Sequence, residues 1–264
     1  MNEKENFMNW DNLGCALITG ASSGIGAEFA RQLAQQGFDL ILVARRKNKL
    51  ETLSQDLISK FSIKVEVLIA DLSNLSDTEK VASKIFNIDN LDILINNAGF
   101  EINKPFIERK NKQNIDMINV HYTSPVMLCH TAIQGMTKRK KGVIINNASI
   151  SAIFRTTVMY SSTKAALTIF SELLKASVKN TGIYVQALCP GFTYSEFHDS
   201  DSMRGFSRES FSELPWMSAE EVVTLSLNAV KSKNVIFVPG VENRALVMSI
   251  RKSTFKKYLN CKIL

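Results

Sequence analysis

The stretch Thr19-Gly20-Ala21-Ser22-Ser23-Gly24-Ile25-Gly26 follows the apolar run 15–19 and opens the amphipathic segment 25–36. Glycines at this spacing allow a tight turn and let a ligand approach the backbone closely. The free N–H groups and the positive dipole end at the start of a helix attract an anion. A strand, a glycine-rich turn and a helix in this order therefore predict a pyrophosphate-binding loop. The residues expected to line it are Gly20, Ser22, Ser23, Gly24, Ile25 and Gly26.

Two other interpretations of this stretch stay open from spacing alone. The residues also fit an ordinary glycine-rich turn, and Gly20 to Gly24 matches the Gly-x-Ser-x-Gly elbow that carries the nucleophile of serine hydrolases. A hydrolase would need an acid and a histidine later in the chain, and the three histidines stand in no such pattern. Ser22 would also be a nucleophile on the very first strand, so the hydrolase interpretation is the weaker one.

Seven short apolar runs alternate with segments of helical periodicity along the chain. Most runs are continuous, as in Leu40-Ile41-Leu42-Val43, which is typical of strands covered on both faces of a parallel sheet. Segments 25–36 and 49–60 place apolar residues on one helical face, and Ser218 to Glu221 has the form of a capping box. The predicted fold is therefore α/β, a single doubly wound parallel sheet of about seven strands with helices on both faces. The expected strands are 15–19, 38–44, 63–70, 91–96, 142–148, 182–188 and 235–238.

The composition is that of a globular protein, with 264 residues, 45% of them hydrophobic and 22% charged. A chain of this length can bury a large core without a metal or disulfide. No apolar run reaches the ~18 residues of a membrane span. The four cysteines lack the spacing of a zinc site, so we expect no metal. The polar leader 1–12 lacks the features of a signal peptide, which makes the cytoplasm the expected location.

The net charge of +7 lies mainly in the C-terminal two thirds of the chain. The tail from Arg244 to Leu264 holds six Lys or Arg residues and no acid. Its partly amphipathic pattern fits a terminal helix docked on the domain or a weak anchor to anionic membrane, where each cation contributes about 1 kcal/mol. The run Lys138-Arg139-Lys140-Lys141 comes with no nucleic-acid motif, so we expect a solvated turn and no nucleic-acid partner.

The second expected strand ends in Val43-Ala44-Arg45-Arg46-Lys47. A carboxylate at this point would bond the ribose hydroxyls of NAD, whereas a cation accommodates the 2′-phosphate of NADP. Because arginine can form two charge-assisted hydrogen bonds to phosphate, Arg45 and Arg46 predict a preference for NADP(H), with NAD(H) as the open alternative. A solvated charge run is the other interpretation, although cations near a helix N-terminus oppose its dipole.

The motif Thr19-Gly20-x-x-x-Gly24-x-Gly26 closely resembles the glycine motif of the classical short-chain dehydrogenase/reductase family. The resemblance, strongest to bacterial ketoacyl reductases and hydroxysteroid dehydrogenase-like members, runs from about Leu13 to Gly240. It implies a Rossmann fold in one NAD(P)-binding catalytic domain, 13–240, between the leader 1–12 and the tail 241–264. It also implies that further motifs contact the cofactor, namely Asp71, Leu72, Asn97, Ala98, Gly99, Pro190, Gly191, Phe192 and Thr193.

Tyr160 and Lys164 stand four residues apart in an apolar-faced helical segment, so their side chains share one face. A cation ~4 Å from the phenol, at an effective dielectric of ~20, is worth about 4 kcal/mol or roughly three pKa units. We therefore expect Lys164 to bring the pKa of Tyr160 near neutrality, where acid/base catalysis is efficient. The resemblance implies that Lys164 also binds the nicotinamide ribose. It further implies that Asn119 holds a water in the proton relay.

Ser149 follows the fifth expected strand and lies upstream of the tyrosine. By resemblance it is the catalytic serine that hydrogen-bonds the substrate oxygen. The stretch from Ser149 to Tyr160 is slightly shorter than is usual in the family, so Asn147 and Ser151 are alternative registers. The strand pattern at Val143 to Asn146 favours Ser149.

The segment 192–217 is rich in aromatic residues and Met, and it lies where the resemblance places a substrate cover. It fits either a loop packed on its own domain or a mobile apolar lid over a hydrophobic substrate. Phe154, Val158 and Met159 would extend the same apolar wall. His198 is expected to be a hydrogen-bonding loop residue.

The function predicted from these features is NADP(H)-dependent hydride transfer between nicotinamide and an apolar carbonyl or alcohol substrate, with Tyr160 as the acid/base. The alternative is a catalytically silent NADP(H)-binding module that senses redox state. Joint retention of Asn119, Ser149, Tyr160 and Lys164 favours the enzyme. By analogy alone, the segments 111–136 and 157–179 imply a homodimer or homotetramer.

Overall fold

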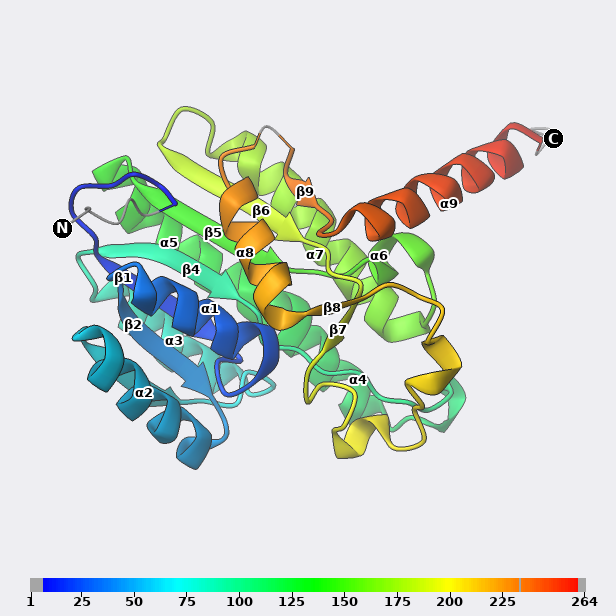
Figure 1. Ribbon diagram of the computed structural model, residues 1–264, viewed down its shortest axis with the longest axis horizontal. Helices are drawn as coiled ribbons and strands as arrows, with labels where there is room; N and C mark the ends of the chain where they lie inside the picture. The colour runs from blue at the N-terminus through cyan, green and yellow to red at the C-terminus, as the bar shows by residue number, and fades with distance from the viewer. Residues whose placement is uncertain (1–6, 233, 261–264) are drawn as a thin grey trace.

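The computed structural model describes residues 7–232 and 234–260, with side chains described as far as residue 250. Seven strands form one parallel sheet in the order β3-β2-β1-β4-β5-β6-β9 (Figure 1). This confirms the predicted doubly wound α/β fold. The strands are β1 (Cys15–Thr19), β2 (Asp39–Ala44), β3 (Val65–Ile69), β4 (Leu91–Asn96), β5 (Gly142–Asn147), β6 (Ile183–Leu188) and β9 (Ile236–Phe237).

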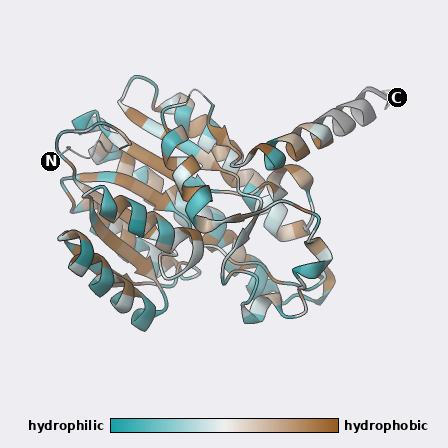
Figure 2. Cartoon of the chain, viewed as in Figure 1, coloured by the Kyte–Doolittle hydropathy of each residue, from teal (hydrophilic) through white to brown (hydrophobic). Residues whose placement is uncertain are grey.

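Helices cover both faces of the sheet, and alternate strand residues face the two layers. In β1, Ala16 and Ile18 belong to the apolar cluster under α1, α2 and α8, whereas Cys15 and Leu17 belong to the cluster under α3, α5 and α7. Figure 2 shows the apolar strands between helices that carry hydrophilic residues on their outer sides. The helices are α1 (Gly24–Gln35), α2 (Lys47–Phe61), α3 (Leu75–Phe86), α5 (Ser124–Arg139), α7 (Val158–Ser177) and α8 (Ala219–Ala229).

Two local signals in the sequence account for where α8 and α5 begin. Ser218 Oγ accepts from Glu221 N, and the Glu221 carboxylate accepts from Ser218 N, which confirms the capping box. The expected helical segment 111–136 is divided into α4 (Asn111–Ile118), a π-helical turn (Asn119–Thr123) and α5. Pro125 lacks an N–H group, so the regular helical ladder cannot continue through this point.

The segment 192–217 contains structure that periodicity did not predict. Its two ends pair as short parallel strands, β7 (Phe192–Tyr194) and β8 (Trp216–Ser218). Between them lie two 3-10 turns, Asp201–Met203 and Glu209–Phe211. The segment is therefore closed at its base and does not hang as a free loop.

The two terminal segments differ in how they join the domain. Met8 is buried, and the rings of Phe7 and Trp10 lie against Phe38, so part of the leader packs on the core; residues 1–6 lie outside the described part. The tail forms α9 (Val241–Asn260), which leads away from the body of the molecule (Figure 1). Residues 261–264, like the side chains beyond residue 250, lie outside the described part of the tail.

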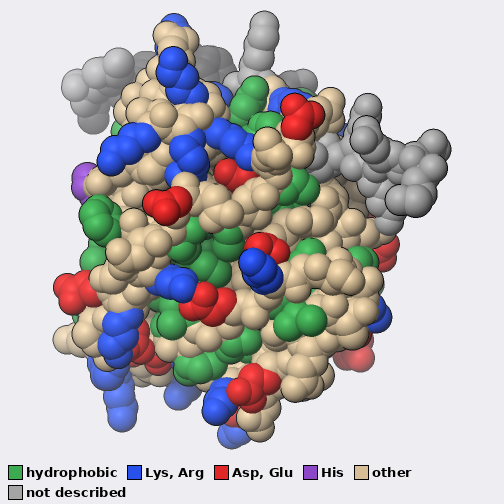
Figure 3. All heavy atoms as spheres, turned by 90° about the vertical axis from the view of Figure 1, so that its left-hand side faces the viewer, with side chains coloured by type: hydrophobic (Ala, Val, Ile, Leu, Met, Phe, Trp, Pro, Cys, Tyr) green, Lys and Arg blue, Asp and Glu red, His purple; other side chains and the backbone are tan. Residues whose placement is uncertain are grey.

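The basic run before β5 is not simply a solvated turn. Arg139 donates to the carbonyl of Leu91, while Lys141 Nζ lies 2.6 Å from Asp92 Oδ2 and 4.4 Å from the centre of the Trp10 ring. Arg139 at the end of α5 and Lys141 in the turn that follows both bind residues of β4. Figure 3 faces the amino-terminal ends of the strands, where basic side chains gather near the top and acidic ones are scattered among and below them. Within the described residues, no helix is apolar and long enough to cross a bilayer.

Candidate active site

A cleft of about 1160 Å³ opens at the carboxyl ends of the strands. Strands β2 and β3 are added on one side of β1, and β4, β5, β6 and β9 on the other, so the strand order reverses between β1 and β4. Ligands of open α/β sheets bind at such a switch point. Residues after β1, β2, β3 and β4 line one half of the cleft, and the segments after β5 and β6 line the other. The motifs singled out in the sequence therefore converge on one site.

The glycine-rich loop depends on conformations that only glycine adopts easily. Gly20 and Gly24 have φ of +66° and +54°, and a Cβ on Gly20 would lie 2.8 Å from the Cα of Ala98. Gly26 plays a different role, because it lies beneath the loop and a Cβ there would collide with the Gly20 carbonyl and the Asn97 side chain. The expected residues Gly20, Ser22, Ser23, Gly24 and Ile25 all line the cleft.

The two arginines after β2 lie at the mouth of this half of the cleft. Arg46 Nη2 donates to Ser22 Oγ at 2.8 Å and to Ser23 Oγ at 2.6 Å. Arg45 Nη1 lies 3.8 Å from Asp71 Oδ2, and both side chains are substantially exposed. Sequence reasoning missed Glu196, whose carboxylate pairs with Arg46 at 2.7 Å and with Lys49 at 2.5 Å.

A chain of amides links the glycine-rich loop to Lys164. Lys164 Nζ donates to the Asn147 carbonyl at 2.6 Å, and Asn147 Nδ2 donates to Asn97 Oδ1 at 2.8 Å. Asn97 Nδ2 in turn donates to the carbonyl of Gly20 at 3.2 Å. The carboxyl ends of β1, β4 and β5 are thus held in register by side chains. Asn147 was considered only as an alternative to Ser149, and it serves this linking role.

Ser149 and Tyr160 are brought together at the centre of the cleft. The Ser149 hydroxyl hydrogen-bonds the Tyr160 phenol, and it also accepts from the Ser151 backbone N–H at 3.1 Å. The Ser151 hydroxyl instead receives a long hydrogen bond, at 3.4 Å, from Thr156. Of the three candidate registers, the structure therefore gives Ser149 the contact with the tyrosine.

The pKa of the Tyr160 phenol is shifted in the opposite direction from the one expected from the nearby Lys164. Burial, followed by the negative charge of Glu101, raises the pKa of the Tyr160 phenol above its ordinary value, and the hydrogen bond from Ser149 offsets only part of this. Burial also lowers the pKa of Lys164 to about 8. The prediction that Lys164 brings the tyrosine near neutrality is wrong here. Its ammonium lies 5.6 Å from the centre of the ring, and burial penalises the charged form of both groups.

Asn119 belongs to a turn that packs against the helix carrying Tyr160 and Lys164. It starts the π-helical turn, and its side-chain amide donates to the Ser73 carbonyl at 3.0 Å. The residue therefore lies outside the cleft lining, and its side chain braces the loop that follows β3.

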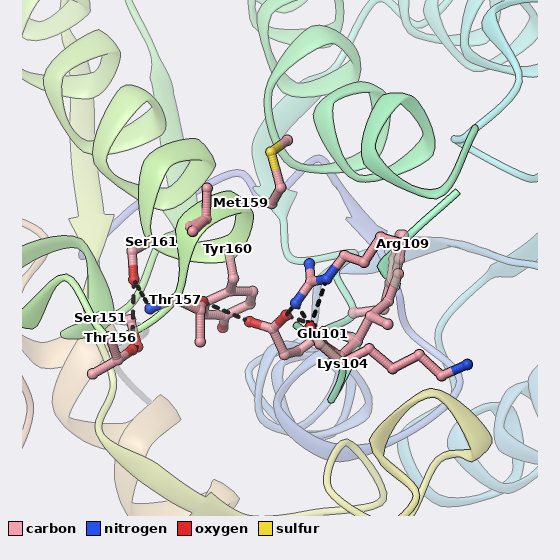
Figure 4. Close-up of polar contacts among 12 residues, drawn as sticks. Glu101, Lys104, Arg109, Ser151, Thr156, Thr157, Met159, Tyr160 and Ser161 are labelled. Carbon is pink, nitrogen blue, oxygen red and sulfur yellow. Dashed lines mark hydrogen bonds and ion pairs between the residues drawn. The ribbon is translucent and has the colours of Figure 1, made fainter. Parts of the chain in front are cut away.

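A buried ion pair beside Tyr160 was missed in the sequence. Glu101 is 8% exposed, and its Oε1 lies 3.1 Å from Arg109 Nη2, while its Oε2 accepts from Thr157 Oγ1 at 3.1 Å (Figure 4). A signal was present, because Glu101 comes two residues after Gly99, close to the carboxyl end of a predicted strand. Acidic side chains at that edge point to a site.

His121 contacts the ring of Tyr160 and is fully buried. Its Nε2 accepts from Phe100 N at 3.1 Å, its Nδ1 is 2.9 Å from Thr163 Oγ1, and its ring meets Tyr160 edge-on at 5.4 Å. Burial and the charge of Lys164 hold the pKa of this histidine well below its usual range. His121 is therefore a neutral packing residue beneath the site.

The segment 192–217 forms the apolar wall of the second half of the cleft. Phe192 stacks on Phe211 at 5.2 Å and on Trp216 at 4.9 Å, so the segment packs largely on itself. It also reaches across the cleft, since Asn103 N donates to the Ser202 carbonyl at 2.8 Å. Of the side chains expected in the apolar wall, Phe154 and Val158 line the cleft and Met159 does not.

His198 is not the hydrogen-bonding loop residue that was expected. Its ring lies between Phe206 at 4.8 Å and Trp216 at 5.2 Å, and its Nδ1 has no hydrogen-bond partner among the described residues. Burial and nearby Arg208 lower the pKa of His198 to about 4. The residue acts as one more ring in an aromatic cluster.

The remaining expected cofactor contacts also reach the cleft. Asp71, Leu72, Ala98 and Gly99 line its first half, and Pro190, Gly191, Phe192 and Thr193 line its second half. Asn243, from the first turn of α9, lies directly against Gly191 and is 1% exposed. The start of the tail is therefore part of the site.

Comparison with known proteins agrees with this geometry. Residues 14–204 match the model of a family described as short chain dehydrogenase. The chain belongs to the short-chain dehydrogenase family. This membership explains why the glycine motif, the amide chain and the Tyr160/Lys164 pair occur together, and it excludes the hydrolase interpretation of Ser22.

Three similar proteins place the chain within the family. It is 32% identical over 192 residues to very-long-chain 3-oxoacyl-CoA reductase-B of Danio rerio, covering 70% of this chain and 61% of that protein. It is also 32% identical over 179 residues to hydroxysteroid dehydrogenase-like protein 1 of Gallus gallus, covering 66% and 54%. The chain thus matches little more than half the length of these curated relatives.

The third is a solved structure, a short-chain dehydrogenase from Sphingobium yanoikuyae in complex with NADPH. It superposes with a TM-score of 0.82 at 28% sequence identity, and the match covers 95% of this chain and 97% of that one. The likeness extends over nearly the whole fold, including the segments that form the cleft.

Proposed function

We propose that this protein is an NADPH-dependent carbonyl reductase that acts on an apolar ketone or ketoacyl substrate. The observation that carries the proposal is the convergence of Ser149, Tyr160 and Lys164 with the glycine-rich loop in one cleft. A silent NADP(H)-binding module would not require the hydroxyl pair of Ser149 and Tyr160 or the buried lysine next to it.

The first half of the cleft fits a nicotinamide dinucleotide. Gly20 and Gly24 leave a cradle that a Cβ would fill, and the start of α1 offers free N–H groups to a pyrophosphate. Asp71 and Leu72 would flank the adenosine, while Lys164 would bind the nicotinamide ribose. Bound NADPH would supply the hydride.

The hydroxyls of Ser149 and Tyr160 would bind the substrate oxygen. Because the pKa of the Tyr160 phenol is raised, the residue stays protonated at neutral pH, the form needed to give a proton to the oxygen of a carbonyl under reduction. Ser149 would donate a second hydrogen bond to that oxygen and hold it beside the phenol. Lys164, with its pKa near 8, carries most of a positive charge at pH 7 and would stabilise negative charge developing on the tyrosine.

The preference for NADP(H) over NAD(H) rests on the cations at the mouth of the cleft. Arg45, Arg46 and Lys49 surround the place where the ribose 2′-phosphate would lie, next to Ser22 and Ser23. Guanidinium groups bind phosphate with two charge-assisted hydrogen bonds. We therefore assign Arg46 as the main phosphate ligand and Arg45 as its neighbour.

The apolar class of substrate follows from the wall of the second half. Aromatic and apolar side chains form a continuous part of that wall, and such surface favours an apolar ligand. They are Phe154, Val158, Phe192, Phe197, Met203, Phe206, Phe211 and Leu246.

The test is a panel of ketones of increasing apolar length, with NADPH oxidation followed by absorbance. We expect turnover to rise with apolar length. Tyr160→Phe should lower kcat by at least about a hundredfold while NADPH still binds. A wild-type chain that binds NADPH but reduces none of the ketones, with Tyr160→Phe indistinguishable from it, would favour the silent module instead.

We also propose that the protein is a homo-oligomer. Ile115 on α4 and both Ile169 and Leu173 on α7 are 54%, 57% and 65% exposed, and they lie on the helices that the family resemblance assigns to subunit contacts. Light scattering of the wild type and of the double variant Ile169→Lys/Leu173→Lys would test this. The variant should shift to a smaller species.

We also propose that the protein is cytoplasmic and that its tail contacts an anionic membrane surface. The tail carries an excess of cations, and α9 leads away from the body of the molecule (Figure 1). Co-sedimentation with vesicles containing phosphatidylserine, before and after deletion of residues 251–264, tests the membrane contact. Equal co-sedimentation of both chains would remove the tail from the proposal.

A further inference from the structure

The buried pair of Glu101 and Arg109 occupies the wall of the cleft next to the proton donor (Figure 4). Both side chains are nearly inaccessible, with 10% and 4% of their area exposed. A buried ion pair adds little net stability, because desolvation of the two charges offsets their attraction. Stability alone is therefore a poor explanation for a charge pair at this position.

The Glu101 carboxylate is held rigidly on three sides. Oε1 accepts from Arg109 Nη2 at 3.1 Å and from the Ile102 backbone N–H at 2.9 Å, and Oε2 accepts from Thr157 Oγ1 at 3.1 Å. Arg109 is itself fixed by hydrogen bonds to the carbonyls of Ile102 and Lys104 at 2.6 and 3.0 Å. The negative charge therefore has a defined place.

Thr157 ties this charge to the helix that carries the catalytic residues. It is the N-cap residue of α7 and lies three residues before Tyr160, and its backbone N–H donates to Ser161 Oγ at 3.1 Å. A carboxylate near a helix N-terminus is favoured by the helix dipole. The distance between the Glu101 charge and the phenol is thus set by the fold.

The charged and titratable groups around Tyr160 come from four elements. Lys164 lies on α7, His121 on the π-helical turn and Cys189 after β6, while Glu101 follows β4 and is paired with the Arg109 cation. His121 is neutral because burial and Lys164 lower its pKa. Of these groups, Glu101 and Cys189 disfavour a negative phenolate, and Glu101 has the larger effect on the pKa of Tyr160.

We propose that Glu101 is a positioning residue that acts through Tyr160: its carboxylate, fixed by Arg109 and Thr157, favours the neutral phenol and so directs the site toward carbonyl reduction. Reduction needs the phenol as a proton donor, whereas alcohol oxidation needs the phenolate as a base. A fixed negative charge beside the ring favours the first and opposes the second. This inference rests on the proposed function, since it assigns the direction of the same reaction.

The test compares Glu101→Gln with the wild type by two measurements. The first is the pH dependence of kcat/KM for ketone reduction and for oxidation of the matching alcohol. The second follows the ring carbon of Tyr160 by NMR on ¹³C-tyrosine-labelled protein saturated with NADP⁺, with Tyr160→Phe used to assign the signal. Glutamine keeps a hydrogen-bond acceptor for Thr157 and removes the charge.

We expect Glu101→Gln to lower the apparent pKa of Tyr160 by about one unit in both measurements. Oxidation should then become active at lower pH, and reduction should decline at lower pH. Glu108→Gln is the matched control, because Glu108 belongs to the same loop but is exposed and lies outside the cleft lining. It should leave both profiles unchanged.

Removal of Glu101 leaves Arg109 buried without its partner and can destabilise the fold. The double variant Glu101→Gln/Arg109→Met removes both charges and should lower the apparent pKa of Tyr160 in the same direction, by less than the single variant. A folded single or double variant whose Tyr160 titrates as in the wild type overturns the inference. The NMR titration needs no turnover. A protein that reduces none of the ketones would refute the proposed function, and the titration would still decide whether Glu101 raises the pKa of Tyr160.

Discussion

Arg46 Nη1 lies 2.7 Å from Glu196 Oε2, and this ion pair joins the cofactor half of the cleft to the segment that covers the substrate half. Lys49 contacts the other oxygen of the same carboxylate. Ser195 also lies against Gly24, because a Cβ added to Gly24 would be 2.9 Å from the Cβ of Ser195. The covering segment is thus fastened over the glycine-rich loop by an acid that sits among the proposed 2′-phosphate ligands.

Glu196→Gln should therefore tighten NADPH binding. The carboxylate competes with phosphate for Arg46 and Lys49, and exposed ion pairs of this kind are worth up to about 1 kcal/mol, so we expect about a two- to fivefold lower Kd. Calorimetric titration with NADPH measures the change, with Glu209→Gln as an exposed control in the same segment. Weaker binding by Glu196→Gln would show that the acid helps to hold the cofactor.

Arg46→Ala should reduce the preference for NADPH over NADH. Loss of a charge-assisted bond to the 2′-phosphate removes about 1.5 to 3 kcal/mol, which corresponds to roughly ten- to a hundredfold in relative affinity. The ratio of the two dissociation constants is the measurement, and the exposed Lys138→Ala serves as the control cation. An unchanged ratio would contradict the assignment of Arg46.

The sheet and the tight glycine-rich turn could be predicted because their signals are local. Continuous apolar strands such as 40–43 and the glycines of residues 20–26 need no knowledge of distant partners. Glu101 and Glu196 could not be assigned in the same way, because their roles depend on Arg109 and Arg46, which only the fold brings near. The pKa of Tyr160 was predicted in the wrong direction for the same reason: sequence spacing revealed the nearby lysine but not the burial of the ring.

Lys164→Met should stabilise the fold at neutral pH. Burial lowers the pKa of Lys164 from about 10.5 to about 8, so the unfolded chain binds the proton more tightly and the folded state loses stability as the pH falls from 10.5 to 8. A shift of this size corresponds to about 3 kcal/mol, from which about 1 kcal/mol is lost with the hydrogen bond to Asn147, leaving a gain of about 2 kcal/mol.

The sign of this effect also sets its pH dependence. The cost of the buried charge is complete below pH 8 and disappears as the pH rises toward 10.5, so the advantage of Lys164→Met should shrink over that range. Urea unfolding at several pH values gives the free energies. The exposed Lys179→Met should show no such trend, and a constant difference between Lys164→Met and the wild type would be evidence against a lowered pKa.

Gly26→Ala should destabilise the protein by about 1 to 3 kcal/mol and impair cofactor binding. Its Cβ would strike the Gly20 carbonyl and the Asn97 amide, both of which belong to the site. Gly135→Ala is the matched control in α5, where a Cβ meets only the end of the Arg139 side chain and alanine favours the helix. Thermal unfolding and NADPH titration of both variants measure the two effects. Equal effects in the two variants would contradict a specific need for glycine at position 26.

The positions of Asn119 and Asn147 could be predicted from the sequence, but their hydrogen-bond partners could not. Both are asparagines near an element end, and sequence spacing does not show which groups the fold brings near them. The π-helical turn directs Asn119 toward Ser73, whereas β5 directs the carbonyl of Asn147 toward Lys164. Likewise, the polar appearance of the tail concealed Asn243, which the fold places against Gly191.

The chain has two tryptophans, and they lie in different parts of the fold. Trp10 packs against Phe38 and Lys141 next to the core, whereas Trp216 stacks on Phe192 at the base of the covering segment. With Trp10 replaced by phenylalanine, the remaining indole is an intrinsic fluorophore stacked on Phe192, which lines the cleft. Its fluorescence therefore reports on the covering segment alone, without any added label.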